Sequence, residues 1–132
     1  MPLLRLQWFL EDEANREYSL AILASLSKKR ALVPPLWFYE VGNGLIMAYR
    51  RKRITFDQID GFLIRLKTLP IDAAQRTPSE LFESPIIANT RGLTSYDAAY
   101  LALAVRFDLP LATNDSNLRQ AAAAASINLV TV

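Results

Sequence analysis

Three acidic residues are the strongest candidates for chemistry in this chain: Glu40, Asp97 and Asp115. Glu40 lies on an apolar ridge of an expected helix, where a charge is costly unless it is paired or bound to a ligand. Asp97 and Asp115 each stand at the start of an expected helix, and Asp115 follows a strand expected to end at Thr113. Clustered carboxylates favour a divalent cation, which activates water and stabilises the leaving oxygen of a phosphodiester. The residue types therefore indicate phosphodiester cleavage assisted by Mg²⁺ or Mn²⁺, with the oxygen of Thr113 beside the site.

Each acid also has a purely structural interpretation. Glu40 could be a surface residue on an imperfectly amphipathic helix. Asp97 follows Thr94 by three positions, as in a capping box, and Asp115 could cap the helix that it precedes. If the acids are only caps, their carboxylates lie far apart, whereas a metal site requires them to converge at one edge of a sheet.

The composition narrows the possible chemistry, because the 132 residues include no His and no Cys. A Ser-His-Asp triad, a cysteine nucleophile and a metal held by imidazole or thiolate are therefore excluded. The net charge is only +2, but cations gather in the run Arg50, Arg51, Lys52 and Arg53. Such a run suits the end of a helix and equally suits the phosphate backbone of RNA. We interpret it as a candidate RNA-binding segment.

Helical patterns alternate with short apolar runs, which is typical of an α/β domain with a mostly parallel sheet. The length fits one domain over residues 1–132. Apolar runs are too short to cross a membrane, and the lack of cysteine fits a cytoplasmic protein. We expect helices over 13–29, 36–51, 55–68, 78–91, 95–107 and 116–126, and strands over 31–33, 69–72, 109–113 and 127–132.

Two segments of the chain resemble the PIN domain, and within it the VapC-type toxins of bacterial toxin–antitoxin pairs. They are LVPPLWFYEVGNGL at 32–45 and GLTSYDAAYLALAVRFDLPLATND at 92–115, and QWFLEDE at 7–13 is similar to the family's first helix. The resemblance implies a three-layer α/β/α fold and Mg²⁺- or Mn²⁺-dependent endoribonuclease activity. It also implies homodimers and inhibition by a cognate VapB-like antitoxin. The family's acidic residues match Glu40, Asp97 and Asp115, the Thr of its T-x-D motif matches Thr113, and Asn43 fits as a neighbour of the site.

One part of the family pattern is missing. The family's first strand ends in an Asp about seven residues before the Trp that matches Trp8, and counting back from Trp8 reaches Met1. The resemblance therefore implies that the first strand is truncated or absent, that its Asp is lost and that the ribonuclease is impaired. The alternative is a catalytically inactive PIN-like module that binds an antitoxin or RNA.

An interface is also expected on the first two helices, whose apolar residues exceed what one face of the sheet needs. These residues are Trp8, Phe9, Leu10, Tyr18 and Ile22.

Overall fold

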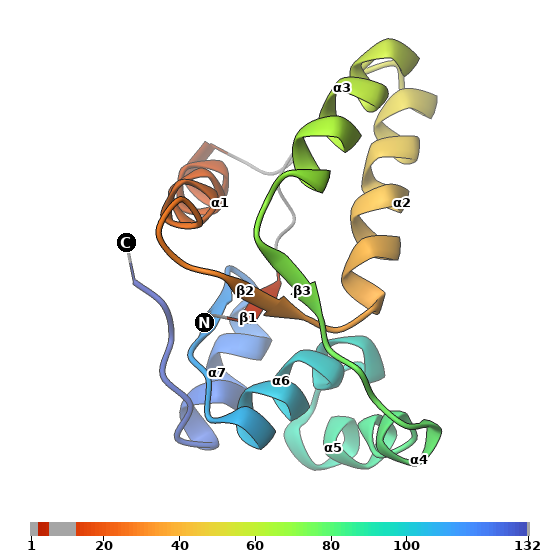
Figure 1. Cartoon of the computed structure of the whole chain (residues 1–132). Helices are drawn as coiled ribbons and strands as arrows, with labels where there is room; N and C mark the ends of the chain where they lie inside the picture. Colours follow the sequence, from red (N-terminus) through yellow and green to blue (C-terminus); the bar gives the residue numbers. More distant parts are fainter. Residues whose placement is uncertain (1–2, 6–12, 132) are drawn as a thin grey trace.

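The fold is known from a computed structural model, which describes residues 3–5 and 13–131. At its centre is a four-stranded sheet in the order β3-β2-β1-β4, and all of its pairings are parallel. Figure 1 shows α1, α2 and α3 on one side of this sheet and α4, α5, α6 and α7 on the other. The expected three-layer α/β/α architecture with a short parallel sheet is thus confirmed. The strands are β1 (Leu3–Arg5), β2 (Ala31–Val33), β3 (Ile71–Ala73) and β4 (Leu111–Thr113).

The first strand is present, so the expectation that it is absent is wrong. β1 is as long as the other strands and lies between β2 and β4. Leu3 is paired with Leu32 on one side, and Arg5 is level with Thr113 on the other. Because all four strands run in the same direction, their carboxyl ends meet at one edge. At that edge the last described residue of β1 is Arg5, and the first acidic residue of the sequence is Glu11.

The helices follow local signals in the sequence. The side chain of Thr55 caps one helix in a complete capping box with Gln58, and Gly92 ends another in the left-handed conformation, with φ of 66°. The helix expected over Ser95–Phe107 is found with these same bounds. The helices are α1 (Glu13–Ser25), α2 (Leu36–Arg50), α3 (Phe56–Lys67), α4 (Pro78–Leu81), α5 (Ser84–Arg91), α6 (Ser95–Phe107) and α7 (Ser116–Ala124).

Two expected elements differ from the structure. The single helix expected over 78–91 is divided into α4 and α5, because Pro85 lacks an N–H and its ring would clash with the preceding turn. The expected strand 127–132 is reduced, in its described part, to one parallel bridge between Leu111 and Leu129. The segment is joined to β4 by two backbone hydrogen bonds of one residue, Leu111. The N–H of Leu111 donates to the carbonyl of Asn128 at 2.8 Å, and the carbonyl of Leu111 accepts from the N–H of Val130 at 2.9 Å.

The core lies on both faces of the sheet, and α6 supplies much of it. Ile22 is fully buried there, and Tyr18 is half-buried with its hydroxyl donating to the carbonyl of Val130 at 2.7 Å. The expected apolar interface on the first helices is therefore wrong for Ile22, which packing within the chain covers, whereas Tyr18 stays partly exposed. Trp8, Phe9 and Leu10 lie outside the described residues. The largest buried side chains include Val33, Leu45, Tyr100, Leu101, Leu103, Leu111 and Leu118.

Candidate functional site

Glu40 is held at the carboxyl edge of the sheet by a tyrosine from the opposite layer. It lies in the second turn of α2, which begins three residues after β2 ends. The hydroxyl of Tyr100, on α6, donates a hydrogen bond to Oε1 of Glu40. Tyr100 is fully buried and Glu40 is half-buried. The two helix layers therefore meet at the candidate site through a charge-assisted hydrogen bond, a stronger class of bond than one between neutral groups.

Asp97 lies in the first turn of α6, and only 9% of its surface is exposed. Thr94 caps this helix, since its Oγ1 accepts from the backbone N–H of Asp97 at 3.1 Å. Asp97 and Tyr100 are three residues apart and so share one face of the helix. Long helical side chains lean towards the N-terminus of their helix, which carries the Tyr100 hydroxyl towards the turn of Asp97. Glu40 and Asp97 are thus brought to the same region, where the helix N-terminus also favours negative charge.

Asp115 lies at the end of β4 and caps α7. Its Oδ2 accepts from the backbone N–H of Leu118 at 2.8 Å, so the structural interpretation of this residue is confirmed. The fully buried Thr113 accepts from the N–H of Asp115 through Oγ1 at 3.1 Å. The carbonyl of Thr113 accepts from Nη1 of Arg119 at 2.8 Å. Both side chains therefore serve the turn between β4 and α7, at the same edge of the sheet as the end of β1.

Comparison with known proteins decides the family. The family model of the PIN domain matches residues 6–124. The chain belongs to the PIN domain family. Members of this family are generally nucleases, and they usually depend on divalent metal ions.

The fold of this PIN domain is also similar to that of a solved protein, PAE2754 from Pyrobaculum aerophilum. The two chains are 28% identical and superpose with a TM-score of 0.68 over 91% of this chain and 83% of that one. No curated protein matches the chain. Among the described residues of this PIN domain, no helix is long and apolar enough to cross a membrane.

The acidic residues of this PIN domain fit a divalent cation only in part. Within residues 3–5 and 13–131, no group of three or more acidic side chains is arranged to hold a metal ion. A formed site with Glu40, Asp97 and Asp115 as joint ligands is therefore not found, and one oxygen of Asp115 already accepts the capping bond. Mg²⁺, however, is commonly held by one or two carboxylates together with phosphate oxygens of the substrate. Glu40, which is bonded to Tyr100, and Asp97, three residues before Tyr100 on α6, fit this smaller set.

The four cations Arg50, Arg51, Lys52 and Arg53 are exposed at the end of α2. Figure 1 shows this end at the tip of the hairpin of α2 and α3, which extends away from the sheet. Sequence reasoning missed the two aromatic residues beside them, Tyr49 and Phe56. Their ring centroids are 5.7 Å apart, with 72° between the ring planes. The signal was available, since the stretch YRRKRITF at 49–56 places an aromatic residue at each end of the cationic run.

Proposed function

We propose that this PIN domain is an endoribonuclease of the VapC type that cleaves RNA with Mg²⁺ or Mn²⁺ at a low rate. The family supports a nuclease, and the hydrogen bond from Tyr100 to Glu40 beside the buried Asp97 carries the placement of the site. That bond holds one carboxylate, and Asp97 lies one turn before Tyr100 on α6, at the carboxyl edge of the parallel sheet, where α/β proteins bind their ligands.

In this proposal Glu40 and Asp97 hold the cation, and Asp115 and Thr113 form the adjacent wall of the site. The bound cation would activate water and stabilise the leaving oxygen of the phosphodiester. Tyr100 positions Glu40, and the first turn of α6 positions Asp97. The rate is low because the described strand β1 contains no acidic residue, whereas the resemblance places an Asp at the end of this strand. A site with fewer carboxylates attracts a divalent ion less strongly.

The test has a loss arm and a gain arm, both measured as cleavage of single-stranded RNA with Mn²⁺. Asp97→Asn is expected to abolish cleavage, whereas Asp60→Asn, an exposed acid on α3, leaves it unchanged. Arg5→Asp is expected to raise the rate at least tenfold, which corresponds to about 1.4 kcal/mol of barrier. Cleavage that persists in a folded Asp97→Asn protein would show that Asp97 serves only the helix.

The second candidate is a catalytically inactive PIN-like module that binds an antitoxin or RNA. It is favoured by the lack of a three-carboxylate group among the described residues. The gain arm separates the two candidates, because Arg5→Asp raises activity only where the rest of a catalytic site is present. A wild-type protein and an Arg5→Asp protein that are both inactive with Mn²⁺ would favour the inactive module.

We also propose a homodimer and a cognate VapB-like antitoxin as partners, acting in the cytoplasm where RNA is available. Large exposed apolar side chains support an interface: Tyr39 and Phe82 are each 77% exposed and Ile86 is 69% exposed. Sedimentation of the purified chain is expected to show a dimer. A monomer that persists at high micromolar concentration would contradict this part of the proposal.

A further inference from the structure

The tip of the hairpin of α2 and α3 is a fixed structure whose backbone groups are paired internally. At the end of α2, the N–H of Lys52 donates to the carbonyl of Tyr49 and the N–H of Arg53 donates to that of Ala48, both at 2.9 Å. These two bonds form a Schellman motif. Thr55 then starts α3 through its reciprocal bonds with Gln58, at 2.8 and 3.2 Å. The side chains of the tip therefore stand on a defined scaffold and are not needed to satisfy its backbone.

Lys52 occupies the position of this motif at which glycine is favoured. Its φ is 60°, in the left-handed region, where a side chain carries a steric cost. A glycine there would remove the cost and keep both Schellman bonds, since they use only backbone atoms. The lysine side chain is therefore not explained by the fold, which indicates a role for its charge at the surface.

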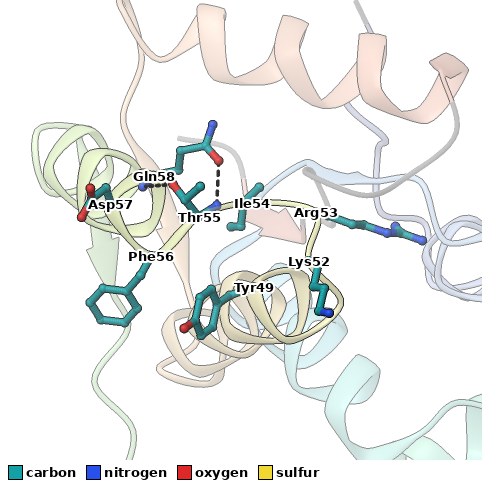
Figure 2. Close-up of a pocket in the computed structure, with 8 residues that line it drawn as sticks. All are labelled: Tyr49, Lys52, Arg53, Ile54, Thr55, Phe56, Asp57 and Gln58. Atoms are coloured by element: carbon teal, nitrogen blue, oxygen red, sulfur yellow. Dashed lines mark hydrogen bonds between the residues drawn. The ribbon is translucent and has the colours of Figure 1, made fainter.

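Two aromatic rings stand beside this charge. Tyr49 is 43% exposed and Phe56 is 54% exposed. Their edge-to-face packing, with ring planes at 72°, fixes both rings while leaving about half of each residue open to solvent. The rings line a shallow pocket of about 510 Å³, together with Lys52, Arg53, Ile54, Thr55, Asp57 and Gln58. Figure 2 shows Tyr49, Lys52 and Phe56 pointing to the same side of the connecting segment, whereas Arg53 extends away from the rings.

The charge of the tip is strongly one-sided. Four consecutive cations occupy 50–53, and the lining of the pocket includes one acid, Asp57. In the part of the chain that the structure describes, the ion pairs are made by other residues, Arg30 with Asp72 and Glu80 with Arg76 and Arg106. Four like charges next to one another repel. The phosphates of a nucleic acid neutralise these cations, and the nucleic acid releases its condensed counterions as it binds.

We propose that this tip binds single-stranded nucleic acid, with bases stacked on Tyr49 and Phe56 and phosphates held by residues 50–53. Exposed aromatic rings within a positive groove are the means by which proteins bind single strands, because every base has a face that can stack. A duplex would not fit, since its bases are already stacked on one another. The choice of RNA as the strand rests on the proposed function, whereas the binding chemistry of the tip does not.

The test measures binding without cleavage, using the full chain in EDTA and a fluorescently labelled ten-nucleotide RNA of mixed sequence. Tyr49→Ala and Phe56→Ala are each expected to raise the Kd about tenfold, within the range found for loss of one stacked base. Phe107→Ala is the matched control, because Phe107 is 47% exposed, much like the two rings of the tip, but ends α6 on the other side of the sheet. DNA of the same sequence is expected to bind within a few-fold of RNA, and duplex RNA much more weakly.

Lys52→Gly separates binding from folding. We expect it to unfold at the same temperature as the wild type or higher, and to bind RNA more weakly. The slope of log K against log salt concentration should also fall by about 0.7, the contribution of one phosphate contact to a single strand. A Lys52→Gly protein with unchanged affinity and salt dependence would remove the role assigned to this side chain.

The outcomes distinguish this proposal from the proposed function. An Asp97→Asn protein that cleaves nothing is still expected to bind RNA in EDTA with wild-type affinity. A failure of the proposed catalysis would therefore not contradict RNA binding at the tip. Unchanged binding in the Tyr49→Ala/Phe56→Ala double variant would overturn the proposal. Tighter binding of a polyglutamate peptide than of RNA would also overturn it, in favour of an acidic protein partner.

Discussion

Removal of one oxygen atom, in Tyr100→Phe, tests whether the hydrogen bond between the two helix layers holds Glu40 in place. The ring of Tyr100 is fully buried, so phenylalanine keeps the packing and deletes only the hydroxyl that donates to Glu40. Hydrogen bonds to charged groups contribute about 1.5–3 kcal/mol. Because Glu40 is only half-buried, water replaces part of the lost bond, and we expect a loss at the lower end, about 1.5 kcal/mol.

The expected change in melting temperature follows from the size of the chain. Unfolding entropy is about 2.1 cal/mol/K per residue, so for 132 residues each kcal/mol shifts the melting temperature by about 4 °C. Tyr100→Phe should therefore melt about 5 °C below the wild type. Tyr39→Phe is the matched control, since Tyr39 is 77% exposed, and we expect its melting temperature to stay within about 2 °C.

A double-mutant cycle isolates the bond itself. Urea unfolding of wild type, Tyr100→Phe, Glu40→Ala and the double variant should give a coupling energy of about 1 kcal/mol. The same Tyr100→Phe protein should lose RNA cleavage, because Glu40 is no longer held. A variant as stable as wild type, or a coupling energy near zero, would refute the geometry from which the site was built.

Two further predictions concern contacts outside the site. Tyr18→Phe removes the 2.7 Å bond to the carbonyl of Val130 and should cost about 1 kcal/mol in urea unfolding, with local loss of hydrogen-exchange protection after β4. The Arg30 guanidinium donates two hydrogen bonds to Asp72, at 3.0 and 2.8 Å, and holds the pKa of that carboxyl below its usual range. A lowered folded pKa contributes stability that is present at neutral pH and is lost as the pH falls through that pKa. Asp72→Asn should therefore have a lower free energy of unfolding than the wild type at pH 7, and this difference should become smaller in strong acid. A difference that is the same at both pH values would contradict the assignment.

The elements that the sequence predicted best are those with signals at both ends. The helix over Ser95–Phe107 begins at the cap Thr94 and ends where Asp108 adopts the left-handed conformation, with φ of 51°. By contrast, the apolar residues of 127–132 resemble a strand, but whether a segment pairs is decided by its neighbours in the fold. Within residues 3–5 and 13–131, Leu129 bridges only to Leu111, so the local pattern could not distinguish a strand from an extended segment.

The candidate site was predictable in its residue types but not in its connections. The placement of Asp97 in the first turn of a buried helix could be predicted from the spacing to Thr94. The bond from Tyr100 to Glu40 joins residues 60 positions apart, which no local spacing indicates. Likewise, Arg5 could not be placed at the end of the central strand by counting from Trp8, because that count depends on family spacing and the actual register is set by pairing with β4.

The helix α2 joins the two proposed sites, the carboxylates at the edge of the sheet and the tip of the hairpin. Because this helix is rigid, it fixes the distance at which the two sites would act on one RNA strand. Glu40 lies near the start of α2 and Arg50 at its end, so at 1.5 Å per residue the helix separates them by about 15 Å. α2 carries buried residues along its length, Trp37, Val41, Leu45 and Ala48, which hold it against the core. A strand bound at the tip and cleaved at the sheet edge would therefore be cut at a fixed distance from the stacked bases, because a packed helix, not a mobile loop, spans the interval.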